Sequence, residues 1–195
     1  MTTATKSAGA TMMVLLLLAG AVALGYARWT RGIADADQAL ADGRWEPALA
    51  AYAAAEHRFE TVPVLKQAVP ADYSRVVANQ LWLLYRLRRY DDVIDRAERA
   101  PEAAAPHFWS GLAFFEKGRA EKKPEGQLGW LSRSEEELRR AVDASPADWD
   151  TKYDFELVTR LTAELRKQPK TPPSQLMQLL RPQPKPGANP RRRVG

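Results

Sequence analysis

Twenty consecutive residues near the start of the chain, Ala8 to Ala27, carry no charged side chain. At about 1.5 Å per residue, a helix of this length spans a hydrocarbon layer of about 30 Å. Lys6 precedes the run, and Arg28, Trp29 and Arg31 follow it, as is typical of the membrane–water boundary. The run therefore predicts one membrane-spanning helix that tethers the rest of the chain to a membrane.

A cleaved secretory signal is the alternative interpretation of this run. Its apolar core, Met12 to Leu24, has the length of a signal peptide, and Gly25-Tyr26-Ala27 is an acceptable cleavage site. Tyr26 and Trp29 favour a retained anchor, because these side chains suit a helix that stays in the bilayer. The positive-inside rule weakly favours a cytoplasmic domain, since Arg28 and Arg31 follow the run and only Lys6 precedes it.

The composition after the anchor predicts an all-α domain. Alanine, leucine, arginine and glutamate dominate, and long alternating apolar strands are missing. The chain carries a net charge of +5, but the last 31 residues contain eight basic side chains and no acid, which leaves the first 164 residues with a net charge of −3. A basic tail on a mildly acidic domain argues against a nucleic-acid partner, which requires basic residues on a folded face.

Helix pairs recur along the middle of the chain. The first, Gly43 to Ala55, places a turn glycine two residues before an aromatic and then small or aromatic residues at three- and four-residue spacing. The second, Arg88 to Ala100, has Arg88 at the glycine position. The third begins at Phe108 and resumes near Leu131, after a predicted loop at residues 119–129. Its second helix contributes the apolar stripe Leu131, Ser134, Leu138 and Ala141.

The pattern resembles the tetratricopeptide repeat, a helix–turn–helix unit of 34 residues. It predicts residues 1–31 as the anchor, 32–168 as a short solenoid of helix pairs and 169–195 as a proline-rich basic tail. Ser134 and Glu137 have the spacing of a capping box that opens a helix. The alternative fold is an unrelated antiparallel helical bundle.

The last predicted helix follows Ser145-Pro146. Its apolar residues recur every four positions: Trp149, Tyr153, Leu157, Leu161 and Leu165. Because a repeat stack leaves its terminal apolar face open, we expect this stripe to bury against the third pair as a cap. In the tail, residues 174–181 contain four apolar side chains that suit a short docking helix.

The run from Leu131 to Leu157, LSRSEEELRRAVDASPADWDTKYDFEL, resembles a particular group of proteins. These are the small membrane-anchored repeat proteins encoded with MoxR-type ATPases and von Willebrand factor A proteins, including the MxaK-like proteins of methanol-oxidation gene clusters. The resemblance implies a single-pass protein of the bacterial inner membrane with a periplasmic domain. It also implies an accessory role in maturing a periplasmic enzyme such as methanol dehydrogenase, with the ATPase and the von Willebrand factor A proteins as partners.

Motifs for catalysis or metal binding are missing from the sequence. There is no cysteine, no phosphate-binding glycine loop and no Gly-x-Ser-x-Gly elbow. His57 and His107 lie fifty residues apart and are interpreted as ordinary surface residues, and the acidic cluster Asp148, Asp150 and Asp154 lacks the spacing of a calcium loop. We therefore expect no metal, no cofactor and no enzymatic activity.

The concave groove of the repeats is the predicted partner site. Aromatic side chains beside basic ones suit an extended peptide with an acidic or carboxylate end. The groove candidates are Arg75, Trp82, Tyr85, His107, Phe114 and Lys117. A buried structural role is the alternative for Trp82 and Phe114. The sequence thus favours a non-enzymatic, membrane-tethered interaction module; a metal- or cofactor-handling maturation factor and a secreted repeat protein are the alternatives.

Overall fold

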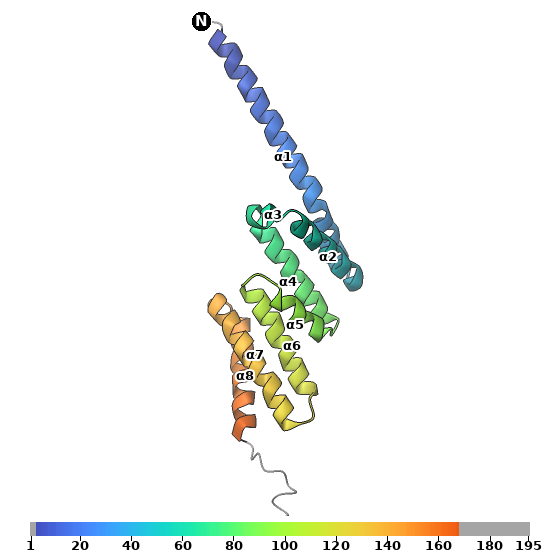
Figure 1. Ribbon diagram of the computed structural model, residues 1–195, viewed down its shortest axis with the longest axis vertical. Helices are drawn as coiled ribbons and strands as arrows, with labels where there is room; N and C mark the ends of the chain where they lie inside the picture. The colour runs from blue at the N-terminus through green and yellow to red at the C-terminus, as the bar shows by residue number, and fades with distance from the viewer. Residues whose placement is uncertain (1–2, 168–195) are drawn as a thin grey trace, which may run out of the picture.

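The computed structural model describes residues 3–167, and every regular element within them is a helix. The helices are α1 (Thr3–Ala41), α2 (Trp45–Thr61), α3 (Val64–Ala68), α4 (Pro70–Arg86), α5 (Tyr90–Glu98), α6 (Ala104–Ala120), α7 (Pro124–Ala144) and α8 (Trp149–Lys167). Successive helices pack on one another from α1 to α8, so the molecule is a stack with α1 at one end and α8 at the other (Figure 1). The predicted all-α class is confirmed.

Helix α1 is one uninterrupted element of 39 residues. Its first part projects beyond the stack, while Ile33, Ala36 and Ala39 near its end are buried in the core (Figure 1). From Met12 onward the helix is long and apolar enough to cross a membrane, with a mean hydropathy of 1.7 over its best window and none of that window buried. The expected boundary between the anchor and the solenoid, after residue 31, falls inside this helix.

The turns after α1 and α4 have the same backbone geometry. Gly43 has φ of 70° and Arg88 has φ of 58°, so both lie in the left-handed region. In each turn, this residue donates its amide hydrogen to the carbonyl three residues earlier, and the next amide donates to the carbonyl five residues earlier. Arg88 therefore occupies the position of the turn glycine, as the sequence pattern predicts.

The small residues of the repeat pattern lie where helices cross. Ala48 and Ala55 of α2 are buried with Tyr52 between them, and the predicted stripe of α7 is buried as well. At the crossing of α6 and α7, a Cβ built on Gly111 would approach Leu138 Cγ to 2.8 Å. Ser134 Oγ donates a hydrogen bond of 2.7 Å to the Gly111 carbonyl there. Side chains any larger would hold these two helices apart.

Two expectations for α7 are wrong. Residues 119–129 do not form a loop, because α6 continues to Ala120 and α7 begins at Pro124. Pro124 stands in the first turn of α7, where its missing N–H has no helical partner to lose. Ser134 and Glu137 consequently lie inside α7 and do not open a helix.

The expectation that the apolar stripe of α8 buries against the third helix pair is also wrong. Trp149 and Tyr153 are 77% and 69% exposed, and α8 instead packs on α7 through Thr151, Val158 and Thr162. The threonine hydroxyls are satisfied locally, by the Asp148 carboxylate and by the Val158 carbonyl. Short side chains let the two helices approach closely, whereas the large aromatic rings are left on the opposite face. The predicted proline-rich tail, including residues 174–181, lies outside the described residues.

Candidate functional site

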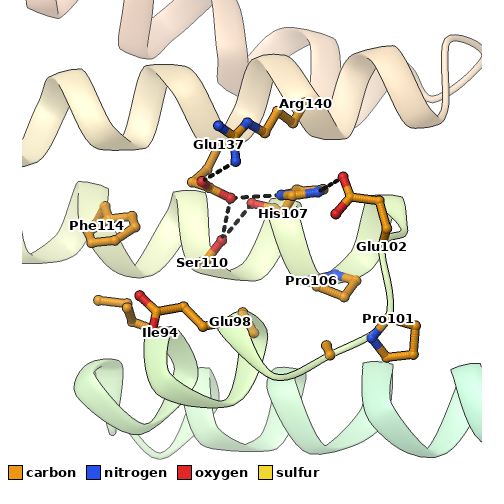
Figure 2. A pocket seen from close by; sticks show the side chains of 12 residues that line it. Ile94, Glu98, Pro101, Glu102, Pro106, His107, Ser110, Phe114, Glu137 and Arg140 are labelled. Atoms are coloured by element: carbon orange, nitrogen blue, oxygen red, sulfur yellow. Dashed lines mark hydrogen bonds and ion pairs between the residues drawn. The ribbon is translucent and has the colours of Figure 1, made fainter.

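A cavity lies between α5, α6 and α7 (Figure 2). It has a volume of about 210 Å³. Its polar lining comes from Glu98, Glu102, His107, Ser110, Glu137 and Arg140, and Ile94, Pro106 and Phe114 contribute apolar surface. Glu102 stands on the connection before α6, so three successive segments of the chain meet around the His107 ring.

Two carboxylates hold the imidazole of His107. Nδ1 lies 2.7 Å from Glu137 Oε2, and Nε2 lies 2.6 Å from Glu102 Oε1. The side chain of His107 is 11% exposed, which contradicts its interpretation as a surface residue. Because each ring nitrogen faces a carboxylate, both contacts are favourable only when both nitrogens carry a proton.

The charge on His107 follows from this geometry. Burial opposes the charged ring, but the hydrogen bonds to Glu137 and Glu102 outweigh burial and raise the pKa of His107 above its ordinary value. When the ring is protonated, the imidazolium forms an ion-pair link between α7, α6 and the connection that precedes α6.

We expect this link to make the stability of the domain depend on pH. A raised pKa in the folded state means that the stabilisation is fully present below about pH 6.5, the ordinary histidine value, and is lost as the pH rises through the folded-state pKa. The melting temperature of the wild-type protein should fall as the pH rises from about 6.5 through the folded-state pKa of His107. Thermal melts of His107→Gln across the same pH range, monitored by circular dichroism, provide the comparison. If its melting temperature depends on pH as that of the wild type does, His107 is not the source of the pH dependence.

The cluster has the geometry of a structural link and lacks that of a nucleophile–base pair. Ser110 Oγ lies 3.2 Å from Glu137 Oε2 and 3.1 Å from the His107 carbonyl, two alternative acceptors for its single hydroxyl hydrogen, and neither is an imidazole nitrogen. Within residues 3–167, no group of three histidine or acidic side chains has an arrangement that could hold a metal ion. Asp148 caps α8, since Oδ1 accepts hydrogen bonds from the amides of Asp150 and Thr151.

The predicted groove residues on α4 lie in separate surroundings. Arg75 is half-exposed and pairs with Asp37 of α1, with Nη1 2.5 Å from Oδ2. Trp82 packs against Trp45 of α2 with ring centroids 5.8 Å apart. Each of these side chains therefore joins α4 to a helix of the first pair.

Tyr85 lies at the junction of α4, α5 and α6. Its ring is 5.4 Å from that of Trp109 and 5.6 Å from that of Tyr90. Burial, followed by the charge of Glu116, raises the pKa of Tyr85 to about 12, so the phenol stays protonated at neutral pH. Its main contacts are thus aromatic and lie within the stack.

The groove candidates on α6 are largely covered. Phe114 is 9% exposed and stacks on Trp130 with centroids 6.0 Å apart, and Lys117 Nζ lies 4.6 Å from the centre of the same ring. Lys117 also pairs with Asp91 of α5. The structure thus brings Phe114 and Lys117 together but places the six candidates in several distinct contacts. Their use by a partner stays a prediction.

Sequence reasoning missed the two carboxylates that define the His107 cluster. Glu137 carried a usable signal, because it lies next to Leu138 on the predicted buried stripe of α7. Glu102 carried none, since it reaches His107 only when the connection before α6 folds back. No protein-family model matches the chain, and no curated protein matches it. The link to the membrane-anchored repeat proteins therefore depends on the sequence resemblance alone.

Proposed function

We propose that this protein is a non-enzymatic, membrane-tethered protein-interaction module built on a tetratricopeptide-like solenoid. Three features support the solenoid: the equivalent left-handed turns at Gly43 and Arg88, the small residues at the helix crossings, and the order in which successive helices pack. Such stacks present extended surfaces to protein partners.

The observation that carries the proposal is the continuity of α1. One helix contains the apolar run and also buries Ile33, Ala36 and Ala39 in the first helix pair. Tyr26, at the end of the run, donates a hydrogen bond of 2.9 Å to Asp72 of α4. The stack is therefore held against the anchor in a defined orientation, which suits a protein that positions others at a membrane.

The exposed face of α8 is the docking surface that we assign to partners. Trp149 and Tyr153 lie one turn apart, and Leu157 and Leu161 extend the stripe while remaining more than a third exposed. Helix α8 is at the end of the stack that is farthest from the free part of α1 (Figure 1). Contiguous apolar side chains with aromatic anchors are typical of protein interfaces.

The sequence resemblance supplies the biological setting of the proposal. Following it, we propose a protein of the bacterial inner membrane with the stack on the periplasmic side, which acts as an accessory factor in maturing an enzyme such as methanol dehydrogenase. MoxR-type ATPases and von Willebrand factor A proteins are the proposed partners.

Replacing both Trp149 and Tyr153 by alanine should abolish most partner capture, because truncating an aromatic anchor costs about 2 kcal/mol or more of binding free energy. Crosslinking in intact cells, followed by mass spectrometry of the captured chains, measures this. Val64→Ala is the matched control, since Val64 is 64% exposed but lies on α3, away from the stripe. Undiminished capture of the proposed partners by the double variant would refute the docking surface.

A further inference from the structure

A second hollow lies where α1 leaves its apolar run. It has a volume of about 510 Å³. It is lined by Gly25, Arg28, Trp29, Arg31, Gly32 and Asp35 of α1 and by Arg58 of α2. Gly25, Arg28, Gly32 and Asp35 recur at three- and four-residue spacing, so one side of the helix forms its floor.

Arg58 reaches this site because α2 packs back along α1. Its guanidinium lies over Gly32, where an added Cβ would come within 2.5 Å of Nη1. The absence of a side chain at Gly32 therefore makes the room that Arg58 occupies. Trp29 closes the site beside them, with its ring edge-on to Phe59 at a centroid distance of 5.4 Å.

The charge of this hollow is strongly positive. Three arginines face it with one aspartate, Asp35. Among the described residues, none of Arg28, Arg31 and Arg58 forms an ion pair. Guanidinium groups without carboxylate partners present forked donors that match the oxygens of a phosphate group.

The depth of the hollow matches a lipid headgroup. Counting about 1.5 Å per residue from Ala27, Arg28 and Gly32 stand roughly 2 and 8 Å beyond the apolar run, within the polar layer of a bilayer. Val62 and Val64 are exposed, and Val62 lies one turn after Arg58, whose carbonyl accepts a hydrogen bond of 3.1 Å from the Val62 amide. An exposed apolar side chain one turn from Arg58 suits contact with a membrane surface.

We infer that Arg28, Arg31 and Arg58 form a binding site for the phosphate of an anionic phospholipid headgroup. The bound lipid fixes the rotation of α1 in the leaflet and thereby the direction in which the stack faces. The inference rests on the retained anchor of the proposed function.

The test uses the full-length protein in nanodiscs that contain equal amounts of phosphatidylglycerol and phosphatidylcholine, with native mass spectrometry of the lipids that stay bound. We expect preferential retention of phosphatidylglycerol by the wild-type protein. Arg58→Gln should reduce this preference about fivefold, the factor that one basic residue near an anionic surface contributes. Gly32→Leu should reduce it similarly, because the side chain displaces the Arg58 guanidinium while the charge is kept.

Two matched controls should retain the lipid as the wild type does. Gly20→Leu places the same side chain at a glycine with open space around it, and Arg99→Gln removes an exposed arginine on the stack. Equal retention of both lipids by the full-length protein, or undiminished preference in Gly32→Leu, would overturn the site. Loss of the preference on adding millimolar inorganic phosphate would assign the site to free phosphate and overturn the lipid.

The same spectra report the intact mass of the chain. A mass that lacks residues 1–27 would refute the retained anchor and the lipid site together. The full-length mass without lipid preference would refute the lipid site alone.

Discussion

Replacing Phe59 by alanine should destabilise the domain by about 3–5 kcal/mol, the usual cost of truncating a buried aromatic side chain. Phe59 is fully buried, and its ring contacts Trp29 of α1 and Tyr73 of α4 at centroid distances of 5.4 and 5.2 Å. Its loss leaves a cavity where three helices meet. The melting temperature of the full-length protein in detergent, monitored by near-ultraviolet circular dichroism, should decrease by roughly 10 °C.

Trp149→Ala is the matched control for this prediction. It also removes an aromatic ring, but the ring is 77% exposed, so we expect a change within about 0.5 kcal/mol. A loss of stability as large as that of Phe59→Ala would mean that Trp149 is covered in solution. The stripe of α8 would then not be available to partners.

Replacing Glu56 by alanine should cost about 3 kcal/mol, because it leaves Arg96 buried without its counter-charge. The two side chains are only 14% and 11% exposed and form an ion pair between α2 and α5. Glu56 also accepts a hydrogen bond of 2.9 Å from Gln80 of α4. Within residues 3–167, Arg96 pairs through Nη2 with Glu56 alone, and its buried Nε has no hydrogen-bond partner, so the charge of Arg96 would be left uncompensated.

Two further variants separate the ion pair from general effects of substitution. Asp92→Ala breaks the half-exposed pair with Arg89 and should cost less than about 1 kcal/mol. The double variant Glu56→Met and Arg96→Met removes both charges and should recover most of the stability. Equal melting temperatures for Glu56→Ala and Asp92→Ala would contradict the role of the buried pair; the measurement is again a thermal melt.

The buried face of α2 was predictable because its signal is local. The spacing of Ala48, Tyr52 and Ala55 identifies a buried face without any knowledge of the partner helix. The start of α7 was missed for the opposite reason: Gly126 and Gly129 disfavour a helix by about 1 kcal/mol each, but packing against α6 overrides them. Trp130, which follows directly, stacks on Phe114 and shows what that packing supplies.

The buried face of α8 was not predictable from periodicity alone. The helix carries a large apolar stripe and a second stripe centred on Thr151, Val158 and Thr162, and both repeat at helical spacing. The choice between them depends on how closely α7 approaches, which is a property of the assembled stack. The His107 cluster was missed for the same reason, since Glu102 and Glu137 come from segments that meet only after folding.

The unbroken backbone of α1 has a consequence for the membrane-tethered module that we propose. In a continuous helix, each residue advances the chain by about 1.5 Å and turns it by about 100°. The number of residues between the apolar run and Ile33 therefore sets the rotation of the stack about the helix axis, relative to the run, as well as its distance from the run. A flexible linker would leave this rotation open, whereas the continuous helix fixes it, so in the proposed module a partner bound to one face of the span would meet the same side of the stack each time.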